Sequence, residues 1–240
     1  MLKIYFFTPF LLIFIWSAEL HAQSQSFLSL YKEQLPYFQE LITGGQYAEP
    51  PLNYEGHPYF QTRVFEEGYL LINGIKYIGV QLLFDENADV LVTFHPIYKQ
   101  KILIKPEKVE EFQLEGGKLF RRFEGNESFP KHGNGFYEVL KDGKIKVLLK
   151  HYKEAEPTKE IGKYTYKFVE DSEYFYWYEG DFIPIRKKKQ AIKSLGLNKK
   201  EVKSIQKEKD IYFALEKEKF ILELAVLREG KSDEFNGFYE

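Results

Sequence analysis

The sequence predicts a mainly β (α+β) protein: an antiparallel meander forming a curved sheet or a barrel-like unit, with a short N-terminal helix and C-terminal helices. Three observations support this fold class. Between Gly68 and Arg186, short apolar segments with alternating polarity are separated by turn signals. Asn73-Gly74, Gly116-Gly117 and Asp142-Gly143 each suit a two-residue type I′ hairpin turn. Aromatic residues make up 18% of the chain, and Tyr and Phe favour pleated, half-buried surfaces.

Residues 1–22 have the features of a secretory signal peptide. Lys3 precedes an apolar run from Ile4 to Trp16, and Ala22 directly precedes the expected cleavage site. The run is shorter than the roughly 20 residues of a comfortable bilayer span. Leu20 is not the small residue usual at the −3 position, so an uncleaved N-terminal anchor is the alternative. We expect an exported protein with no transmembrane span in its mature chain.

Composition narrows the class of protein further. The chain has no Cys, which excludes a disulfide scaffold, thiolate metal sites, a cysteine nucleophile and a lipid-anchored lipoprotein. Removal of the signal leaves about 218 of the 240 residues, enough to bury a hydrophobic core. The formal net charge of −2 does not suggest nucleic acid as a partner.

Residues 23–67 are expected to be a helical and irregular lead-in that packs on the sheet. The apolar spacing of residues 26–42 predicts one or two short helices, with Pro36 as a break. The segment that follows is rich in Gly and Pro. Its aromatic residues are expected to pack onto the β unit: Tyr47, Tyr54, Tyr59 and Phe60.

Residues 68–186 are expected to form the antiparallel β meander. By composition, residues 125–135 are a loop and residues 153–163 a polar linker. So many consecutive strands must curve, close or stack, because open sheet edges invite aggregation. The predicted strands are Gly68–Ile72, Ile75–Phe84, Asp89–Phe94, Lys101–Lys105, Lys108–Leu114, Lys118–Phe123, Gly135–Lys141, Lys144–Tyr152, Tyr164–Val169, Tyr174–Tyr178 and Phe182–Ile185.

Residues 187–230 are expected to be a basic helical segment. A first helix covers residues 187–195 and ends at Gly196. Asn198 with Glu201 resembles a capping box and begins a second helix that reaches about residue 209. A last helix, with apolar residues on one side, is predicted to end at Gly230, and residues 231–240 are expected to be a loose tail.

Several segments follow one another in a specific order: Gly56-His57-Pro58-Tyr59-Phe60, Glu67-Gly68 with INGIKYIGVQLLFD and DVLV, GFYEVLKDGKIKVLLK (135–150), Tyr174–Tyr178 and Lys187–Leu195. Together these segments resemble a family of small secreted proteins of unknown function from Bacteroidetes-type bacteria. Their resemblance covers most of the mature chain. The resemblance implies a secreted or envelope location, which we expect to be periplasmic or outer-membrane-associated, and it implies no catalytic residues.

No motif in the sequence indicates a catalytic residue, a cofactor or a metal site. Asp85, Asn87 and Asp89 have the spacing of the first half of an EF-hand loop. Val90 and Pro96, however, stand where that loop needs Gly and Glu. A hairpin turn is therefore the better interpretation. The histidines of the mature chain show no metal-ligand spacing, and no Ser lies in a G-x-S-x-G elbow.

Two rows of aromatic residues are candidates for ligand binding. Residues 164, 166 and 168 share one face of their predicted strand, and residues 174, 176 and 178 share one face of the next, with Trp177 opposite. Paired across a hairpin, the rows would form aromatic ladders. One face should be core, and the other is either a platform for a sugar or lipid or simple cross-strand packing. The candidate ligand-binding residues are Tyr164, Tyr166, Tyr174, Tyr176, Trp177 and Tyr178.

The strongest charge feature is the segment from Arg186 to Lys209. Its ten basic and two acidic residues give it a charge of +8, which leaves about −10 for the rest of the chain. Apolar residues of the two helices can dock on the β domain, so the lysines should form an outward face. Such a face either attracts an anionic surface or only keeps the protein soluble. The candidate contacts with an anionic surface are Lys187, Lys188, Lys189 and Lys193.

Three functional classes remain open from the sequence. The first is a non-catalytic envelope protein that binds an unknown protein partner or an anionic membrane surface. The second is a carrier of an apolar, lipid-like ligand in a curved-sheet cavity, which a large apolar pocket would favour. The third is a hydrolase that uses carboxylates, which two buried acids with shifted pKa values converging in a cleft would favour.

Overall fold

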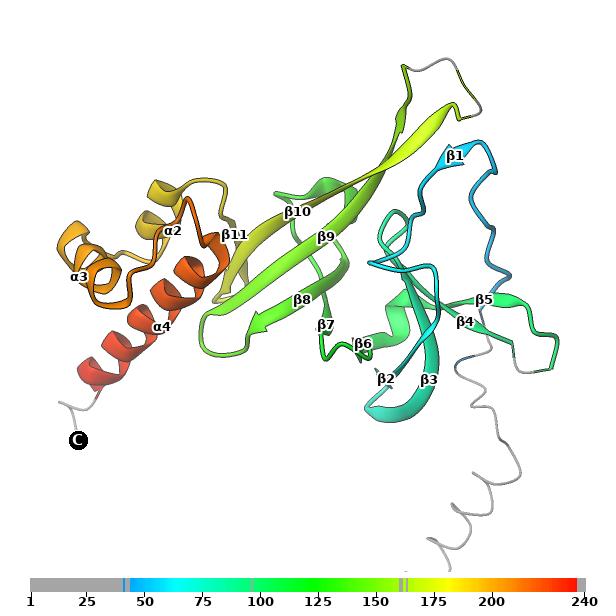
Figure 1. Cartoon of the computed structure of the whole chain (residues 1–240). Coiled ribbons are helices and arrows are strands. Elements are labelled where there is room, and N and C mark those ends of the chain that lie inside the picture. The colour runs from blue at the N-terminus through cyan, green and yellow to red at the C-terminus, as the bar shows by residue number, and fades with distance from the viewer. Residues whose placement is uncertain (1–40, 42–43, 96, 160–161, 163, 237–240) are drawn as a thin grey trace, which may run out of the picture. The chain divides into compact units, whose positions relative to one another are not determined.

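The computed structural model describes residues 41, 44–95, 97–159, 162 and 164–236 (Figure 1). The predicted signal peptide and almost all of the predicted N-terminal helix lie outside the described residues. From Gly44 onward the described chain is mainly β, with eleven strands in one curved, open sheet and three α-helices after it. The predicted fold class is therefore confirmed in its curved-sheet form.

The elements follow the predicted order closely. The strands are β1 (Tyr54–Glu55), β2 (Glu66–Ile72), β3 (Ile75–Asp85), β4 (Val90–Phe94), β5 (Lys101–Ile104), β6 (Val109–Gln113), β7 (Leu119–Phe123), β8 (Gly135–Lys141), β9 (Lys146–Pro157), β10 (Tyr166–Tyr178) and β11 (Asp181–Pro184). The helices are α2 (Lys188–Ser194), α3 (Lys199–Lys209) and α4 (Lys217–Asn236), with short 3₁₀ turns at Pro106–Lys108 and Pro130–His132.

The sheet contains two meanders rather than the single one predicted. Its strand order is β1-β10-β9-β8-β7-β6-β2-β3-β4-β5, with β11 also on β10. The chain therefore leaves β5 and returns to pair β6 with the far side of β2. The edge of β5 is already occupied, because Gln46 bridges to Ile102 and Leu103 N donates to Gly45 O at 2.9 Å. The strand pairs are antiparallel except for the two-residue pair of β1 with β10.

A β-bulge in β3 explains how the chain makes this return. Gly68 pairs with Val80 and Tyr69 with Ile78, which leaves Gly79 as the extra residue, with φ +73°. A glycine in this conformation at a bulge bends the strand sharply. The first part of β3 therefore pairs with β2, and only its last three residues pair with β4.

The bend places the end of β3 against β6, β7 and β8. Phe84 lies within 5.3 Å of the Phe112 and Phe120 ring centroids and 6.0 Å from that of Phe136. Phe60, from the lead-in, completes the cluster by packing edge-on to Phe120 at 5.3 Å. All five rings are buried. This aromatic cluster fills the space between the β3 corner and the sheet.

One of the three predicted type I′ turns is confirmed. Asn73 and Gly74 have φ values of 50° and 73° between β2 and β3. Gly117 alone takes a positive φ, in the longer β6–β7 loop where its N–H donates to Leu114 O. Residues 142–145 form a four-residue β8–β9 loop in which Gly143 lies against the Glu229 carboxylate of α4. The two-residue assignment is wrong for both of these loops.

The predicted polar linker at residues 153–163 is wrong over its first five residues, because β9 continues to Pro157. The predicted strands Tyr164–Val169 and Tyr174–Tyr178 are likewise parts of one strand, β10. An ion pair between the directly opposed Lys153 and Glu170 at 3.3 Å explains why polar residues continue the ladder. β9 and β10 therefore form one long hairpin.

The helices bury their apolar side chains in a common cluster with β9 and β10. Ala191, Leu195, Val202 and Leu224 are among the buried members, and Tyr176 of β10 is another. The predicted capping box is confirmed, since the Asn198 side chain accepts from Glu201 N while Glu201 accepts from Asn198 N. α4 passes Gly230 and ends at Asn236, so the predicted end of the last helix at Gly230 is wrong, whereas the loose character expected of residues 231–240 stays a prediction.

Replacement of Gly135 by Ala should destabilise the protein, because a Cβ there would lie 1.9 Å from the Asp89 carboxylate and 3.0 Å from Lys150 Nζ. We expect a loss of about 2–4 kcal/mol in the free energy of unfolding, measured by urea denaturation. Gly116→Ala, which meets open space, is the control and should change it by less than about 0.5 kcal/mol. Equal effects of the two substitutions would contradict the close packing at Gly135.

Candidate functional site

The structure separates the six candidate aromatic residues. They do not pair across a hairpin, because Tyr166 to Tyr178 lie on one strand. Tyr176 is fully buried, and Tyr174 and Tyr178 pack beside it against the helices. Trp177 packs on the opposite face, in the cluster of Phe129, Tyr137, Leu148 and Phe175. The predicted double ladder is therefore wrong, and only Tyr164 and Tyr166 remain exposed at the other end of β10.

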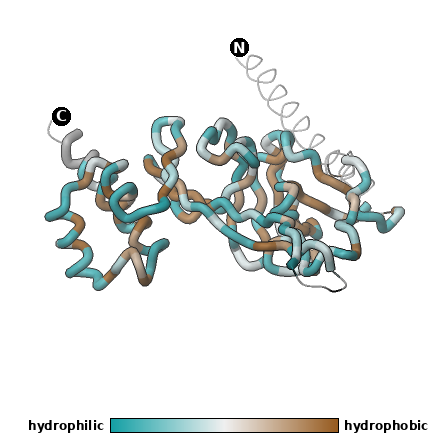
Figure 2. Tube along the Cα trace, turned by 90° about the horizontal axis from the view of Figure 1, so that it is seen from above, coloured by the Kyte–Doolittle hydropathy of each residue, from teal (hydrophilic) through white to brown (hydrophobic). Residues whose placement is uncertain are grey.

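The basic segment has the arrangement expected from the sequence. All ten Lys and Arg side chains between residues 186 and 209 are exposed, whereas Ala191, Leu195, Leu197 and Val202 are buried. We call these ten residues, carried mainly by α2 and α3, the basic face. The tube in Figure 2 is largely teal, meaning hydrophilic, along the helices near the C label and is interrupted by brown residues.

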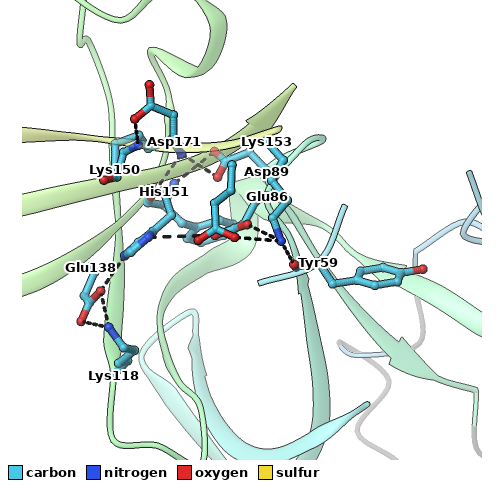
Figure 3. A network of polar contacts seen from close by, with 12 residues as sticks. Tyr59, Glu86, Asp89, Lys118, Glu138, Lys150, His151, Lys153 and Asp171 are labelled. Carbon is cyan, nitrogen blue, oxygen red and sulfur yellow. Dashed lines mark hydrogen bonds and ion pairs between the residues drawn. The ribbon is translucent and has the colours of Figure 1, made fainter. Parts of the chain in front are cut away.

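A buried polar network joins the β3–β4 turn to β8 and β9 (Figure 3). Lys150 of β9 is fully buried, and its Nζ lies 2.6 Å from Asp89 Oδ1 and 2.9 Å from Phe136 O. The other Asp89 oxygen accepts from Phe136 N at 3.2 Å. The Tyr137 ring centroid lies 5.0 Å from the Lys150 ammonium and adds a cation–π contact. The charged pair is thus closely surrounded by partners.

A second ion pair joins the same turn to β9, through Glu86, three residues before Asp89. Glu86 is fully buried, and its Oε2 lies 3.2 Å from Lys153 Nζ, but neither carboxylate oxygen has a well-oriented hydrogen bond. Asn87 Nδ2 donates to Lys153 O at 2.8 Å. Lys153 also donates to the backbone oxygen of Tyr59, which ties the lead-in to β9. These contacts fix the turn on the long hairpin.

His151 connects the buried acids to the edge of the network. Its Nε2 lies 2.6 Å from Glu138 Oε2, and its Nδ1 lies 4.0 Å from Glu86 Oε1. Lys118 donates to both Glu138 oxygens at 2.8 and 2.9 Å. The imidazole packs against the aromatic cluster, with the Phe60 centroid 5.0 Å away. A chain of polar contacts therefore runs from the interior to the half-exposed Lys118.

The environments of the two glutamates shift their pKa values in opposite directions. Burial raises the pKa of Glu86 and outweighs the opposing attraction of Lys153. Burial also acts to raise the pKa of Glu138, but hydrogen bonds from His151 and Lys118 lower it below its ordinary value. Opposed shifts of this kind are found in acid–base pairs of enzymes.

The described residues also line a pocket of about 420 Å³ beside β1. Glu49, His57, Tyr59, Arg63 and Lys101 contribute polar groups to it, and its apolar lining includes Tyr54, Tyr164 and Phe168. A neighbouring hollow of about 800 Å³ shares Gly56, Tyr164 and Phe168. We call the first of these the β1 pocket. It contains one of the candidate aromatic residues and none of the candidate basic residues.

Tyr59 links the β1 pocket to the network described above, because its backbone oxygen accepts from Lys153. Tyr59 OH donates to Glu49 Oε2 at 2.7 Å, and Lys101 Nζ pairs with the other oxygen of Glu49. Tyr47 packs beside Tyr59, and its OH donates to the buried Asp85 at 2.6 Å. Burial raises the pKa of Asp85 and outweighs the Tyr47 hydrogen bond. Asn87 N and Ala88 N both donate to Asp85 Oδ1. Asp85, Asn87 and Asp89 therefore belong to a hairpin turn, which is the interpretation preferred from the sequence.

Sequence reasoning did not find the network or the β1 pocket. One signal for the network was present, because Val147, Leu148, Leu149 and Lys150 run through a strand without alternation, which indicates burial on both faces. A lysine in such a strand needs a buried acid as partner. That partner is Asp89, 61 positions away in the sequence, and only the fold brings it next to Lys150. The pocket depends equally on segments distant in sequence.

No protein-family model, no curated protein and no solved structure matches this chain. Within the part of the chain that the structure describes, no group of three or more His, Asp or Glu side chains is placed to hold a metal ion. No helix formed by the described residues is long and apolar enough to cross a membrane.

The Glu138→Gln variant should lose stability at neutral pH but much less in acid. The depressed pKa of Glu138 stabilises the fold above the ordinary value of 4.5, and this contribution is lost as pH falls through the folded-state pKa. At pH 7 we expect a loss of about 1–2 kcal/mol in urea unfolding. The difference from wild type should shrink at about pH 3.

Glu127→Gln, at an exposed glutamate, is the matched control and should show no such pH-dependent difference. If Glu138→Gln differs from wild type by the same amount at both pH values, the carboxylate of Glu138 is not the stabilising group.

Proposed function

We propose that this protein is an exported, non-catalytic envelope protein that attaches to an anionic membrane surface through the basic face. The observation that carries this proposal is the exposure of all ten basic side chains while the apolar side of the same helices is buried. The location is an expectation from the signal peptide features and the family resemblance. The surface attraction follows from the charge and its placement.

Few of these charges are neutralised within the protein. Arg186 pairs with Glu173 and Lys209 with Glu223, and Lys188 donates to Gln206. Among the described residues, no ion pair is formed by the other seven: Lys187, Lys189, Lys193, Lys199, Lys200, Lys203 and Lys207. Unpaired charges on one surface add their fields and attract anions over about a Debye length.

The spacing and the type of these residues favour a diffuse anionic surface as partner. Lys199, Lys203 and Lys207 are spaced four residues apart in α3, so their ammonium groups lie along one side of the helix. Repulsion between these like charges weakens the helix. Nine of the ten are Lys rather than Arg. Lysine acts as a hydrated point charge, whereas arginine is preferred where a carboxylate or phosphate is held in fixed bidentate geometry. A membrane of anionic lipids needs no fixed geometry.

The link between α3 and α4 adds apolar groups next to the charges. Tyr212 is 46% exposed and Leu215 82% exposed, and they come three and six residues after Lys209 in the chain. Tyrosine is enriched at membrane interfaces because its ring is apolar while its hydroxyl is polar and stays hydrated. This combination of lysines with an exposed Leu and Tyr suits a surface that is charged outside and apolar just beneath.

The two alternative functions have weaker support. A carrier needs an apolar cavity, but the space under the β3 corner is filled by the Phe84, Phe112 and Phe120 rings. A hydrolase needs its acids in a cleft. Glu86 and Glu138 have opposed pKa shifts, yet they are 0% and 6% exposed and line neither of the two pockets described above. We infer that their network is structural.

The mature chain from Gln23 should co-sediment with phosphatidylglycerol vesicles at low salt and not with phosphatidylcholine vesicles. Use of the mature chain keeps the apolar run of the signal from binding lipid itself. Substitution of Lys187, Lys188, Lys189 and Lys193 by Gln should weaken binding at least about tenfold, because each charge near the surface contributes. Raising the salt concentration should have a similar effect on wild type.

The matched control replaces four other exposed lysines by Gln: Lys99, Lys105, Lys159 and Lys167. This variant has the same net charge as the first and should retain vesicle binding. Absence of the wild-type chain from the pellet at low salt, or equal loss in both variants, would overturn the proposal. Retention on an acidic protein column without vesicle binding would point to a protein partner instead.

A further inference from the structure

We propose that the β1 pocket binds a pyranose unit of a neutral saccharide. This inference is independent of the membrane attachment proposed above, because the pocket and the basic face share no residue. It stands on three features of the pocket: a carboxylate held in place from behind, an aromatic lining, and additional polar groups that converge on the same space.

The pocket wall is fixed to the sheet despite its irregular backbone. β1 pairs with Tyr166 and Lys167 of β10, and Thr165 N donates to Asn53 O at 2.9 Å. Asn53 Nδ2 also donates to the Thr165 hydroxyl at 2.6 Å. On the other side Tyr59 is held by its backbone contact with Lys153. The lining residues therefore start from a defined geometry, which lowers the entropic cost of binding.

Glu49 is positioned as an acceptor for hydroxyl groups. Tyr59 OH and Lys101 Nζ bind its two oxygens, and these hydrogen bonds outweigh the effect of burial and lower its pKa, so the group is ionised. An ionised carboxylate has about four lone-pair sites and only accepts hydrogen bonds. Its side chain is 54% exposed, so acceptor sites remain open to a ligand. Two neighbouring sugar hydroxyls can donate to such a group.

Aromatic side chains supply the apolar surface that one side of a pyranose needs. The Tyr54 ring centroid lies 5.5 Å from that of Phe168 and 4.9 Å from that of Tyr166, and the Tyr54 and Tyr166 rings are stacked. Tyr164 contributes a further ring to the same pocket. Stacked rings lose little conformational freedom on binding, which makes them a firm platform.

His57 and Arg63 provide the remaining polar groups. Nδ1 of His57 is buried without a hydrogen-bond partner among the described residues, and its ring stacks on Tyr59 at 5.9 Å. Burial, assisted by Lys153 and Arg63, lowers the pKa of His57, so the ring is neutral at pH 7 and can both donate and accept. Arg63 donates to Gly56 O and has further N–H groups. Sugar hydroxyls need this mixture of donors and acceptors.

The volume of the pocket agrees with a small ligand. Its 420 Å³ lies in the range of about 300–1,000 Å³ typical of small-molecule sites. The charges also bear on the class of ligand. Lys101 and Arg63 leave one positive charge in the pocket, but Lys101 is paired with Glu49 and Arg63 donates to Gly56 O. A ligand carboxylate placed against Glu49 would be repelled by its oxygens, whereas hydroxyl groups can donate to them. A neutral polyol fits these groups better than an acidic one.

The test uses methyl glycosides of glucose, galactose, mannose, N-acetylglucosamine and glucuronic acid as probes, each at about 10 mM, a concentration suited to millimolar affinity. Saturation-transfer NMR on the mature chain should detect at least one neutral glycoside. The same glycoside should shift backbone amide signals of Tyr54, His57 and Phe168. These shifts report the site in wild-type protein and need no variant.

Glu49→Gln and Tyr164→Ala should each weaken binding at least tenfold. Their controls are Glu127→Gln and Tyr98→Ala, at exposed residues outside the pocket and outside the basic face, which should bind as wild type. Vesicle binding should be unchanged in Glu49→Gln and Tyr164→Ala, which separates this test from that of the basic face. The proposal is overturned if no neutral glycoside binds, if only the glucuronide binds, or if the shifts lie outside the β1 pocket.

Discussion

The fold depends on a buried ion pair between the β3–β4 turn and β9, a strand that neighbours neither β3 nor β4 in the sheet. Asp89, in the turn after β3, and Lys150 of β9 are 6% and 0% exposed and lie 2.6 Å apart. Burial acts to lower the pKa of Lys150, and Asp89 opposes that shift. A buried ion of this kind is costly unless its partner is in place, so removing either partner should be more harmful than removing both. The pair therefore ties the bent end of β3 to the long β9–β10 hairpin.

The position of the β1 pocket depends on the same turn between β3 and β4, through Glu86. The bulge at Gly79 turns β3, and Phe84 fills the space beneath it. Glu86 then brings Lys153 close enough to hold the backbone of Tyr59, and Tyr59 holds Glu49. The basic face is supported separately, by the cluster that the helices form with Tyr176. One structural framework thus presents two surfaces of different chemistry, one polar and aromatic and the other cationic.

Local patterns in the sequence predicted most of this fold but little of the candidate sites. Alternation of polar and apolar residues located the strands within a few residues, and Asn198 with Glu201 identified the start of α3. Each of these signals is local, because the residues that make it up are only a few positions apart. The return of β6 to β2 and the union of two predicted strands in β10 were missed, since both depend on which edges meet in space. The exposure of Lys187 and its neighbours was predicted from helical periodicity. The convergence of Glu49, Lys101 and Phe168 in one pocket joins three distant segments, so no local pattern encodes it.

A double-mutant cycle between Asp89 and Lys150 tests the central claim most directly. The free energy of unfolding would be measured in urea for wild type, Asp89→Asn, Lys150→Met and the double variant. We predict that each single substitution costs about 3–5 kcal/mol and that the double variant costs much less than their sum, with a coupling of at least about 2 kcal/mol. Losses that add to within about 0.5 kcal/mol would show that the two side chains act independently, and would contradict the claim that this pair holds the bent sheet together.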